Sequence, residues 1–469
     1  MSGRVKLAAW ISIYCLAYPG IAHAQQQVVG APPEAQNMKL VGTSDLQARS
    51  AYQPTIHHQG DRWIAYIGHH GGTDDIPSPV NPQTGKAEPN GTSIVDVTDP
   101  SQPKYLRHIP GQEGTYEAGG AQMVRICDGK ALPKGDRNAV YTLRTFGGEA
   151  HEIWNVADPA NPVLITRIAG LKDTHKNFWE CDTGIAFLVS GAPDWRTRRM
   201  TQVYDLSDPA HPQKIRDFGL PGQEPGSTGA VPTELHGPIS TGPSGNRVYF
   251  GYGTNKGGFL QIVDREKLLN GPKQPTPDNL RSPEISRMPM SAFNGAHTTF
   301  PMPGMPIAEF AHDKDGNSRD IVMIVDEAIL NECNEPRQMV WFADVTVENR
   351  PMMISSYTVP EASGSFCGGE GGSARIPPAR AWRRSITRRW PSSPSSTPAC
   401  ARSTFAIPIT RPKSAISFRR SRRRPTSAAS PVRARIAARS RSRPIMSRPM
   451  SAAISTSSIA PTPACIFWN

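Results

Sequence analysis

The sequence lacks several features that would assign a function directly. It has no Cys-x-x-Cys pair, no nucleophile-elbow motif and no zinc-protease motif, and no helix-type pattern follows its glycine-rich stretches. These absences argue against a zinc ribbon, a thioredoxin-like redox protein and a nucleotide-binding loop. Apolar residues at the helical period are also scarce. With 46 Pro and 41 Gly in 469 residues, the composition favours many short strands joined by turns.

Long hydrophobic runs are absent too. At the N-terminus, Arg4 and Lys6 precede an apolar run from Leu7 to about Tyr18, which is followed by Ala22-His23-Ala24. The run is shorter than the roughly 20 residues that span a bilayer. We therefore expect residues 1–24 to be a secretory signal peptide that is cleaved after Ala24. The mature protein should be periplasmic or secreted, without membrane insertion.

Acidic residues are almost missing from the C-terminal part of the chain. From Gly368 to Asn469 there are 19 Arg and 1 Lys but a single acid, Glu370, which gives this segment a charge of +19. Subtracting it from the net +12 of the whole chain leaves −7 on residues 1–367. The main part of the chain is therefore mildly acidic, and we expect no nucleic-acid partner. The tail, rich in Arg, Ser and Pro, has the composition of a disordered arm.

A shift of the reading frame by one nucleotide near Gly368 is a second interpretation of residues 368–469. The shifted frame permits NAGVRALDIRDPYHP in place of Thr397–Arg411, and ETDERGYIYIVDRANTGLHILE in place of Arg448–Asn469. Both have the alternating apolar positions of β-strands, and the first contains a turn motif that also occurs upstream. We therefore expect an out-of-frame tail with no evolved function.

That motif consists of a short apolar strand, the pattern D-x-x-D-P-x-x-P and another apolar strand. It occurs as SIVDVTDPSQP, IWNVADPANP and VYDLSDPAHP, where Asn replaces the first Asp of the second copy, and weaker copies include Asp264 and Asp344. In such a turn, Asp accepts hydrogen bonds from backbone amides and Pro restricts its own φ. The predicted structural turn residues are Asp96, Asp99, Pro100, Asp158, Pro159, Asp205, Asp208 and Pro209.

Further strand-like runs lie between these copies, at residues 63–67, 139–143, 184–189, 247–252 and 321–325. The recurring unit predicts an all-β fold, a β-propeller of four-stranded antiparallel blades over residues 50–367, after a linker over residues 25–49. About five blades fit in frame, and two more fit in the shifted frame. The parental protein would then have seven blades, and the ring of this chain would be incomplete.

The three phrases SIVDVTDPSQP, IWNVADPANP and VYDLSDPAHP resemble the LVIVD-repeat proteins, a family of mostly exported bacterial β-propellers. The resemblance extends over roughly residues 50–366. It implies the propeller fold. Because most members have no assigned activity, it implies no particular reaction.

Histidines recur where the predicted blades begin, at His57, His175, His236 and His297. The first strand of each blade lines the central channel of a propeller, so these side chains should converge. Imidazoles ligate copper, zinc and iron, which makes the four histidines candidate metal ligands. The arrangement is similar to that of selenium-binding proteins and methanethiol oxidases, which are propellers with a metal near the axis. The alternative is that these histidines only form hydrogen bonds with neighbouring blades.

Four cysteines lie between the signal peptide and the shifted segment, at Cys127, Cys181, Cys333 and Cys367. In an oxidising compartment they can pair. Cys333 and Cys367 bracket the fifth predicted blade and are the expected disulfide, with buried free thiols as the alternative.

Two functions of different class remain open. The first, which we favour because nothing outside the histidines resembles catalytic equipment, is a binding scaffold for an unknown ligand, glycan or protein. The second is a metal-dependent periplasmic enzyme, similar to an oxidoreductase, with a histidine-lined site on the axis. We expect a monomer, and no cofactor other than a transition metal such as Cu, Zn or Fe.

Overall fold

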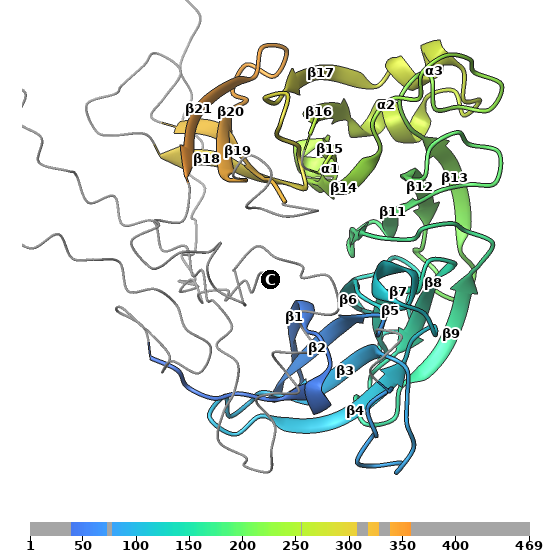
Figure 1. Ribbon diagram of the computed structural model, residues 1–469, viewed down its shortest axis with the longest axis vertical. Helices are drawn as coiled ribbons and strands as arrows, with labels where there is room; N and C mark the ends of the chain where they lie inside the picture. The colour runs from blue at the N-terminus through green and yellow to red at the C-terminus, as the bar shows by residue number, and fades with distance from the viewer. Residues whose placement is uncertain (1–38, 73–76, 255, 307–317, 328–337, 358–469) are drawn as a thin grey trace, which may run out of the picture. The chain divides into compact units, whose positions relative to one another are not determined.

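The computed structural model describes residues 39–72, 77–254, 256–306, 318–327 and 338–357 (Figure 1). The predicted signal peptide and the predicted out-of-frame tail lie outside these residues. Within them, regular structure is nearly all β, in five antiparallel sheets whose main strands follow one another in chain order. No helix in this part of the chain is long and apolar enough to span a membrane.

Each sheet is built from one continuous stretch of chain. The first sheet contains β1 (Tyr52–Gln59), β2 (Arg62–His70), β3 (Gly91–Asp96) and β4 (Lys104–Pro110), with β5 (Gly120–Ala121) paired to β2. The second contains β6 (Val124–Asp128), β7 (Val140–Phe146), β8 (Ala150–Asn155) and β9 (Val163–Ile168). The third contains β10 (Asn177–Trp179), β11 (Ile185–Ser190), β12 (Met200–Asp205) and β13 (Gln213–Phe218).

The last two described sheets follow the same order. The fourth contains β14 (Leu235–Ser240), β15 (Arg247–Tyr252), β16 (Phe259–Asp264) and β17 (Glu284–Pro289). The fifth contains β18 (Thr298–Pro306), β19 (Ser318–Val325), β20 (Val340–Asp344) and β21 (Met352–Tyr357). The described helices are short: η1 (Leu46–Ala48), η2 (Tyr116–Ala118), α1 (Gly242–Gly245), α2 (Arg265–Asn270) and α3 (Pro277–Arg281).

The repeated turn motif connects the third and fourth strands of the first three sheets. Oδ1 of Asp96 and Asp205, at the ends of β3 and β12, accepts the backbone N–H two residues later at 2.9 and 2.8 Å. Asp99, Asp158 and Asp208 accept a second amide, again two residues later, at 2.9 to 3.0 Å. Pro100, Pro159 and Pro209 follow these Asp residues directly. Because these carboxylates satisfy backbone donors, each motif is held in the same turn conformation.

The fourth sheet departs from this pattern because a helix replaces the turn. Asp264 ends β16, and its side chain accepts the backbone N–H of Lys267 at 3.0 Å, which makes it the N-cap of α2. The corresponding position ends the third strand of each described sheet. In the fourth sheet it is followed by a helix instead of the repeated turn.

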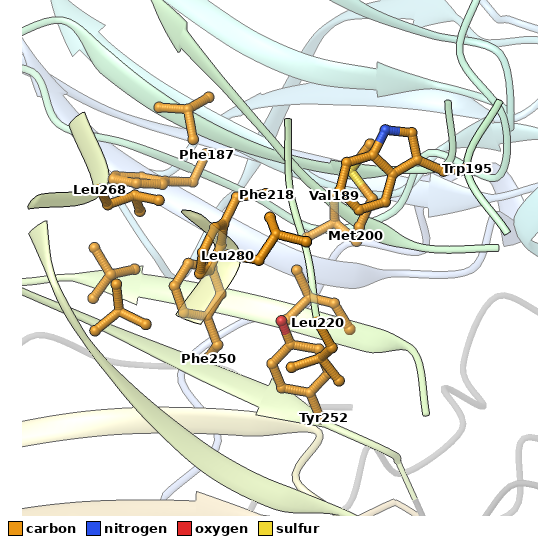
Figure 2. Packing of buried hydrophobic residues seen from close by; sticks show 14 of the residues in the cluster. Phe187, Val189, Trp195, Met200, Phe218, Leu220, Phe250, Tyr252, Leu268 and Leu280 are labelled. Carbon is orange, nitrogen blue, oxygen red and sulfur yellow. The ribbon is translucent and has the colours of Figure 1, made fainter. Parts of the chain in front are cut away.

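Apolar clusters lie between successive sheets. Figure 2 shows one of them, in which Phe187 and Phe218 of the third sheet meet Phe250 and Tyr252 of the fourth. The first strands of consecutive sheets also contact one another, β1 with β6, β6 with β10, β10 with β14, and β14 with β18. Four-stranded antiparallel sheets that pack face to face, with their first strands adjacent, are the blades of a β-propeller. The predicted fold class is confirmed, with five described blades.

A disulfide joins two neighbouring blades. It links Cys127, in β6, with Cys181, two residues after the end of β10. The expected pair Cys333–Cys367 lies outside the described residues.

Part of the predicted linker over residues 25–49 is packed against the first blade. Leu46 belongs to the apolar cluster on one face of that sheet. Arg49 is buried and donates to the backbone oxygens of Glu88 and Pro79 at 3.0 and 3.2 Å. Ordered structure therefore begins before residue 50.

Candidate metal centre

Three of the four predicted histidines meet at the inner strands of the third, fourth and fifth blades. His175 lies two residues before β10, His236 is the second residue of β14, and His297 immediately precedes β18. The ring centroids of His175 and His236 are 4.4 Å apart, and those of His236 and His297 are 3.9 Å apart. The three side chains come from equivalent places in successive blades, because the first strands of these blades lie side by side.

Hydrogen bonds determine which nitrogen carries the proton in two of these rings. His236 Nδ1 lies 2.8 Å from the backbone oxygen of His297, which can only accept, so Nδ1 of His236 carries the proton. The Nε2 lone pair of His236 then faces Nε2 of His175 at 2.8 Å, so His175 donates from Nε2. On its other side, His175 Nδ1 accepts from Nε2 of Gln122 at 2.9 Å. Fixing one imidazole nitrogen on a carbonyl prepares the other for a metal.

Glu327 adds a carboxylate to the group. It lies two residues after β19, and its Oε2 is 3.4 Å from His297 Nε2 and 3.9 Å from His236 Nε2. One ligand atom from each of His236, His297 and Glu327 can be chosen so that all three lie within 4.8 Å of one another. Two imidazoles and one carboxylate with free positions form a donor set that suits iron, and imidazoles also suit copper and zinc.

Burial keeps the three histidines neutral. The pKa values of His175, His236 and His297 lie well below the ordinary value of 6.5, chiefly because burial disfavours the charged ring. Nearby cations such as Lys176 lower these pKa values further. Neutral imidazoles have the free lone pairs that a metal needs.

Lys176 is the cation closest to this group. Its Nζ donates to Thr298 Oγ1 at 2.8 Å and lies 3.2 Å from His297 Nδ1. Burial lowers the pKa of Lys176 and raises the pKa of Glu327. Both shifts disfavour the charged forms of these two side chains.

The distances fit a metal in this group. Two nitrogens that each lie about 2.0 to 2.1 Å from one zinc ion are roughly 2.9 to 3.4 Å apart for angles between 90° and tetrahedral. The Nε2 atoms of His175 and His236 are 2.8 Å apart, and the nearest atoms of His297 and Glu327 are 3.4 Å apart. His236, His297 and Glu327 are therefore spaced closely enough to share an ion, and His175 adjoins them through His236.

His57, the fourth predicted ligand, is separate from this group. It lies near the end of β1, and its Nε2 is 3.0 Å from Asp128 Oδ1 in the next blade. At the other end of β1, the ring of Tyr52 lies 4.4 Å from that of His70. Burial raises the pKa of Tyr52, and the charge of Glu327 adds to this shift.

Sequence reasoning missed Glu327, Gln122 and Lys176. Glu327 reaches the centre because Thr298, at the start of β18, is opposite Val325, at the end of β19, and the sequence does not show this register. The signal for Lys176 was its position next to His175. Nothing in the sequence marks Gln122.

Comparisons with known proteins give a fold likeness only. No protein-family model matches the chain, and no curated protein matches it in sequence. A structure from Bacteroides fragilis, provisionally assigned as a 6-phosphogluconolactonase, is 10% identical, with 66% of this chain and 71% of that chain covered and a TM-score of 0.37. An α-L-arabinofuranosidase from Fusarium graminearum is 10% identical over 66% and 92% of the two chains, with a TM-score of 0.37. A protein from Sulfolobus tokodaii, provisionally assigned as selenium-binding, is 10% identical over 67% and 76%, with a TM-score of 0.34.

Proposed function

We propose that this chain is an exported β-propeller that binds a transition metal through His236, His297 and Glu327, with His175 as a further ligand, and that it acts as a metal-dependent enzyme. The observation that carries the proposal is the convergence of nitrogen and oxygen donors within 4.8 Å of one another. A bound Cu, Zn or Fe ion would supply Lewis acidity or redox chemistry at this site. The residues around it would hold the ligands and move protons.

The hydrogen-bond pattern leaves one nitrogen of His236 suited to a metal. His236 donates from Nδ1 to a backbone carbonyl, so its Nε2 is unprotonated and points at the other candidate ligands. Both nitrogens of His175 and of His236 have a protein partner, so a bound metal would replace the contact between the two Nε2 atoms.

We also propose that the protein is exported and belongs with the LVIVD-repeat propellers. The charged and apolar pattern of residues 1–24, the three repeated phrases and the Cys127–Cys181 disulfide support this assignment. The shift of frame near Gly368 belongs to the same proposal. The parental protein would continue through two further blades, and those blades could add ligands to the centre.

Metal binding is tested directly on the purified full chain. We would remove metals with a chelator, add Zn²⁺, Cu²⁺ or Fe²⁺ separately, remove the excess and measure the metal content per chain by mass spectrometry. We expect about one ion per chain in the wild type, and at least a tenfold weaker affinity in the variants His236→Ala, His297→Ala and Glu327→Gln.

Two controls separate this outcome from general binding to histidine. His211→Ala removes an exposed imidazole, and His57→Ala removes the predicted ligand that lies with Asp128. Both should retain the metal. If all five variants retained the metal equally, or if the wild type retained none, the proposal would be contradicted. The protein would then be better explained as a metal-independent scaffold for a ligand, glycan or protein.

A further inference from the structure

A buried pair of side chains joins the two chain segments that carry the candidate ligands His297 and Glu327. Asn294 lies three residues before His297, and Asp326 lies directly before Glu327. Asn294 Nδ2 donates to Asp326 Oδ2 at 2.8 Å, and both residues are more than nine-tenths buried. The same nitrogen also lies 3.4 Å from Oε1 of Gln338, which is a longer contact. The hydrogen bond between Asn294 and Asp326 is therefore the close side-chain link between the two segments.

Asp326 is also fixed to the third strand of its blade. Trp341, the second residue of β20, donates from Nε1 to the same Oδ2 atom at 2.8 Å. The backbone N–H of Asp326 donates to the oxygen of Met339 at 3.1 Å. A buried carboxylate needs such donors because it has lost its hydrogen bonds with water. Asp326 therefore stays where Asn294 and Trp341 can both reach one of its oxygens.

The regular backbone pairing of the hairpin ends just before this point. Thr298 is the first residue of β18 and is opposite Val325, the last residue of β19. One more backbone bond lies at this end, from the N–H of His297 to the oxygen of Val325 at 2.9 Å. Glu327 follows two residues later, and its N–H donates to the oxygen of Thr254 in the fourth blade at 3.2 Å. The position of the Glu327 carboxylate beside the histidine therefore depends on what holds the residue between Val325 and Glu327.

We infer that Asp326 is a positioning residue that fixes Glu327 beside His297 in the candidate metal centre. Its own carboxylate is bonded to Asn294 and Trp341, so it acts through Glu327 and not on the ion. Glu327 Oε2 lies 3.4 Å from His297 Nε2, and a displacement of about 1 Å is already half the length of a bond to zinc. Residues that orient ligands in this way typically contribute about 10- to 100-fold to metal affinity. The inference rests on the proposed function for the metal, whereas the placement of Glu327 beside His297 needs none.

Metal affinity is the first measurement, and it uses the full chain freed of metal by a chelator. Zn²⁺ and Cu²⁺ are titrated separately in competition with a chromogenic chelator. We expect Asp326→Ala to weaken the ion that the wild type retains about tenfold or more, because Glu327 loses its fixed position. Asn294→Ala should weaken it about three- to tenfold, since the bond from Trp341 to Asp326 remains.

The variant Asp326→Asn separates the hydrogen bonds from the charge. Both donors bond to a single oxygen of Asp326, and an asparagine oxygen at that place can accept both. Asp326→Asn should therefore keep most of the wild-type affinity. Asp344→Ala is the matched control, because Asp344 holds a turn at the opposite end of β20, where its Oδ1 accepts the N–H of Thr346 at 2.9 Å. It should retain full affinity, even if it lowers the midpoint of thermal unfolding.

A second measurement needs no metal. Diethyl pyrocarbonate modifies neutral imidazole nitrogens, and the Glu327 carboxylate lies against Nε2 of His297. In the metal-free chain, we expect His297 to be modified severalfold faster in Asp326→Ala than in the wild type, as measured by mass spectrometry of the peptide that contains it. Asp326→Asn and Asp344→Ala should react at the wild-type rate. If Asp326→Ala does not fold, Trp341→Phe removes one of the two donors and should show a smaller increase of the same kind.

Unchanged modification of His297 in Asp326→Ala would overturn the inference. So would an equal loss of metal affinity in Asp326→Ala and in either Asp326→Asn or Asp344→Ala. A wild type that binds no metal would contradict the proposed function alone, because the modification rates of the metal-free chain then decide the placement of Glu327. If the wild type binds metal and both Asp326→Ala and Asn294→Ala keep its affinity, the metal proposal stands and Glu327 is positioned without Asp326.

Discussion

The Nε2 atoms of His175 and His236 lie 2.8 Å apart, although both belong to neutral rings that come from different blades. Only one of the two nitrogens can carry a proton in this contact. His236 is protonated at Nδ1 because it donates to a carbonyl, so the shared proton belongs to His175. His175 can become a metal ligand through Nε2 only if that proton moves to its Nδ1.

Gln122 controls whether His175 can make this change. Its Nε2 donates to His175 Nδ1, and its Oε1 is buried without a partner in the described part of the chain. Rotating the amide by half a turn would present Oε1 to Nδ1 and accept the relocated proton. We expect Gln122→Met to weaken metal binding about 10- to 100-fold, and Gln122→Glu to keep or strengthen it.

Competition with a chromogenic chelator measures both affinities. Gln59→Met is the matched control, because Gln59 donates to backbone oxygens at the other end of β1. An unchanged affinity in Gln122→Met would mean that His175 is not a ligand, and the centre would then consist of His236, His297 and Glu327 alone.

The disulfide between Cys127 and Cys181 should stabilise the packing of the second blade on the third. It closes a loop with a sequence separation of 54 residues. Loops of this size typically give about 2 to 4 kcal/mol. We expect Cys127→Ser/Cys181→Ser to lower the free energy of unfolding by that amount in urea, and a reductant to do the same to the wild type. A reductant should have no such effect on the double variant, and a remaining effect would indicate another disulfide.

Buried neutral histidines outside the candidate centre should make stability fall in acid. Burial lowers the pKa of His69 and of His151 from 6.5 to about 3. Below pH 6.5 the unfolded chain binds protons that the folded chain excludes, so the free energy of unfolding decreases as the pH falls from 6.5 toward 3. Each histidine should make the free energy of unfolding about 2 kcal/mol lower at pH 5.0 than at pH 7.5, since one pKa unit corresponds to about 1.4 kcal/mol.

Urea unfolding at the two pH values measures this loss. His151→Gln should reduce the difference between pH 7.5 and pH 5.0 by about 2 kcal/mol, even if it lowers stability at both. His211→Gln, at an exposed turn, should leave the difference unchanged. A difference that is the same in both variants would show that His151 is protonated in the folded protein.

The repeated turn motif was enough to predict the fold, because each copy marks the end of a third strand and so sets the order of the blade. It also predicted the convergence of His175, His236 and His297, since repeated positions in repeated blades lie close together. His57 was misplaced because it does not stand at the start of its blade: it lies within β1, shortly before β2, which contains the run at residues 63–67. His57 is therefore near the far end of β1, opposite Ile64.

Glu327 and Gln122 could not be predicted for a different reason. Glu327 reaches the centre through the register of the β18–β19 hairpin, and Gln122 reaches it from the segment between β5 and β6. No repeated residue in the sequence marks either position. The Cys127–Cys181 pair had a signal that the sequence interpretation did not use. Cys127 lies in the first strand of the second blade and Cys181 lies just after the first strand of the third, so the repeat itself brings them together.

Apolar side chains are exposed on the outward faces of the first and fifth blades. In the first sheet, one face carries the apolar cluster that contacts the second blade. Ile56, which is paired with Ala65, lies on the opposite face. Trp63 lies on that same opposite face, and its side chain is 41% exposed. In the fifth sheet, Met352 is 67% exposed and is paired with Asp344, on the face opposite Val322 and Ala343. In a propeller, such faces pack against further blades.

Restoring the proposed reading frame should cover these two faces. We expect the gene to contain a continuous alternative frame from the codon near Gly368, which encodes two more blades. The restored chain should bind less of the dye ANS than the chain as it stands, and it should unfold in urea with a larger m-value, because more apolar surface is buried. A chain ending at residue 367 is the control, since it lacks both the tail and the added blades, and it should resemble the chain as it stands. If the DNA had no such frame, or if dye binding and m-value were equal in all three chains, the tail would have to be regarded as a genuine part of the protein, and its 19 Arg would need a binding partner of their own.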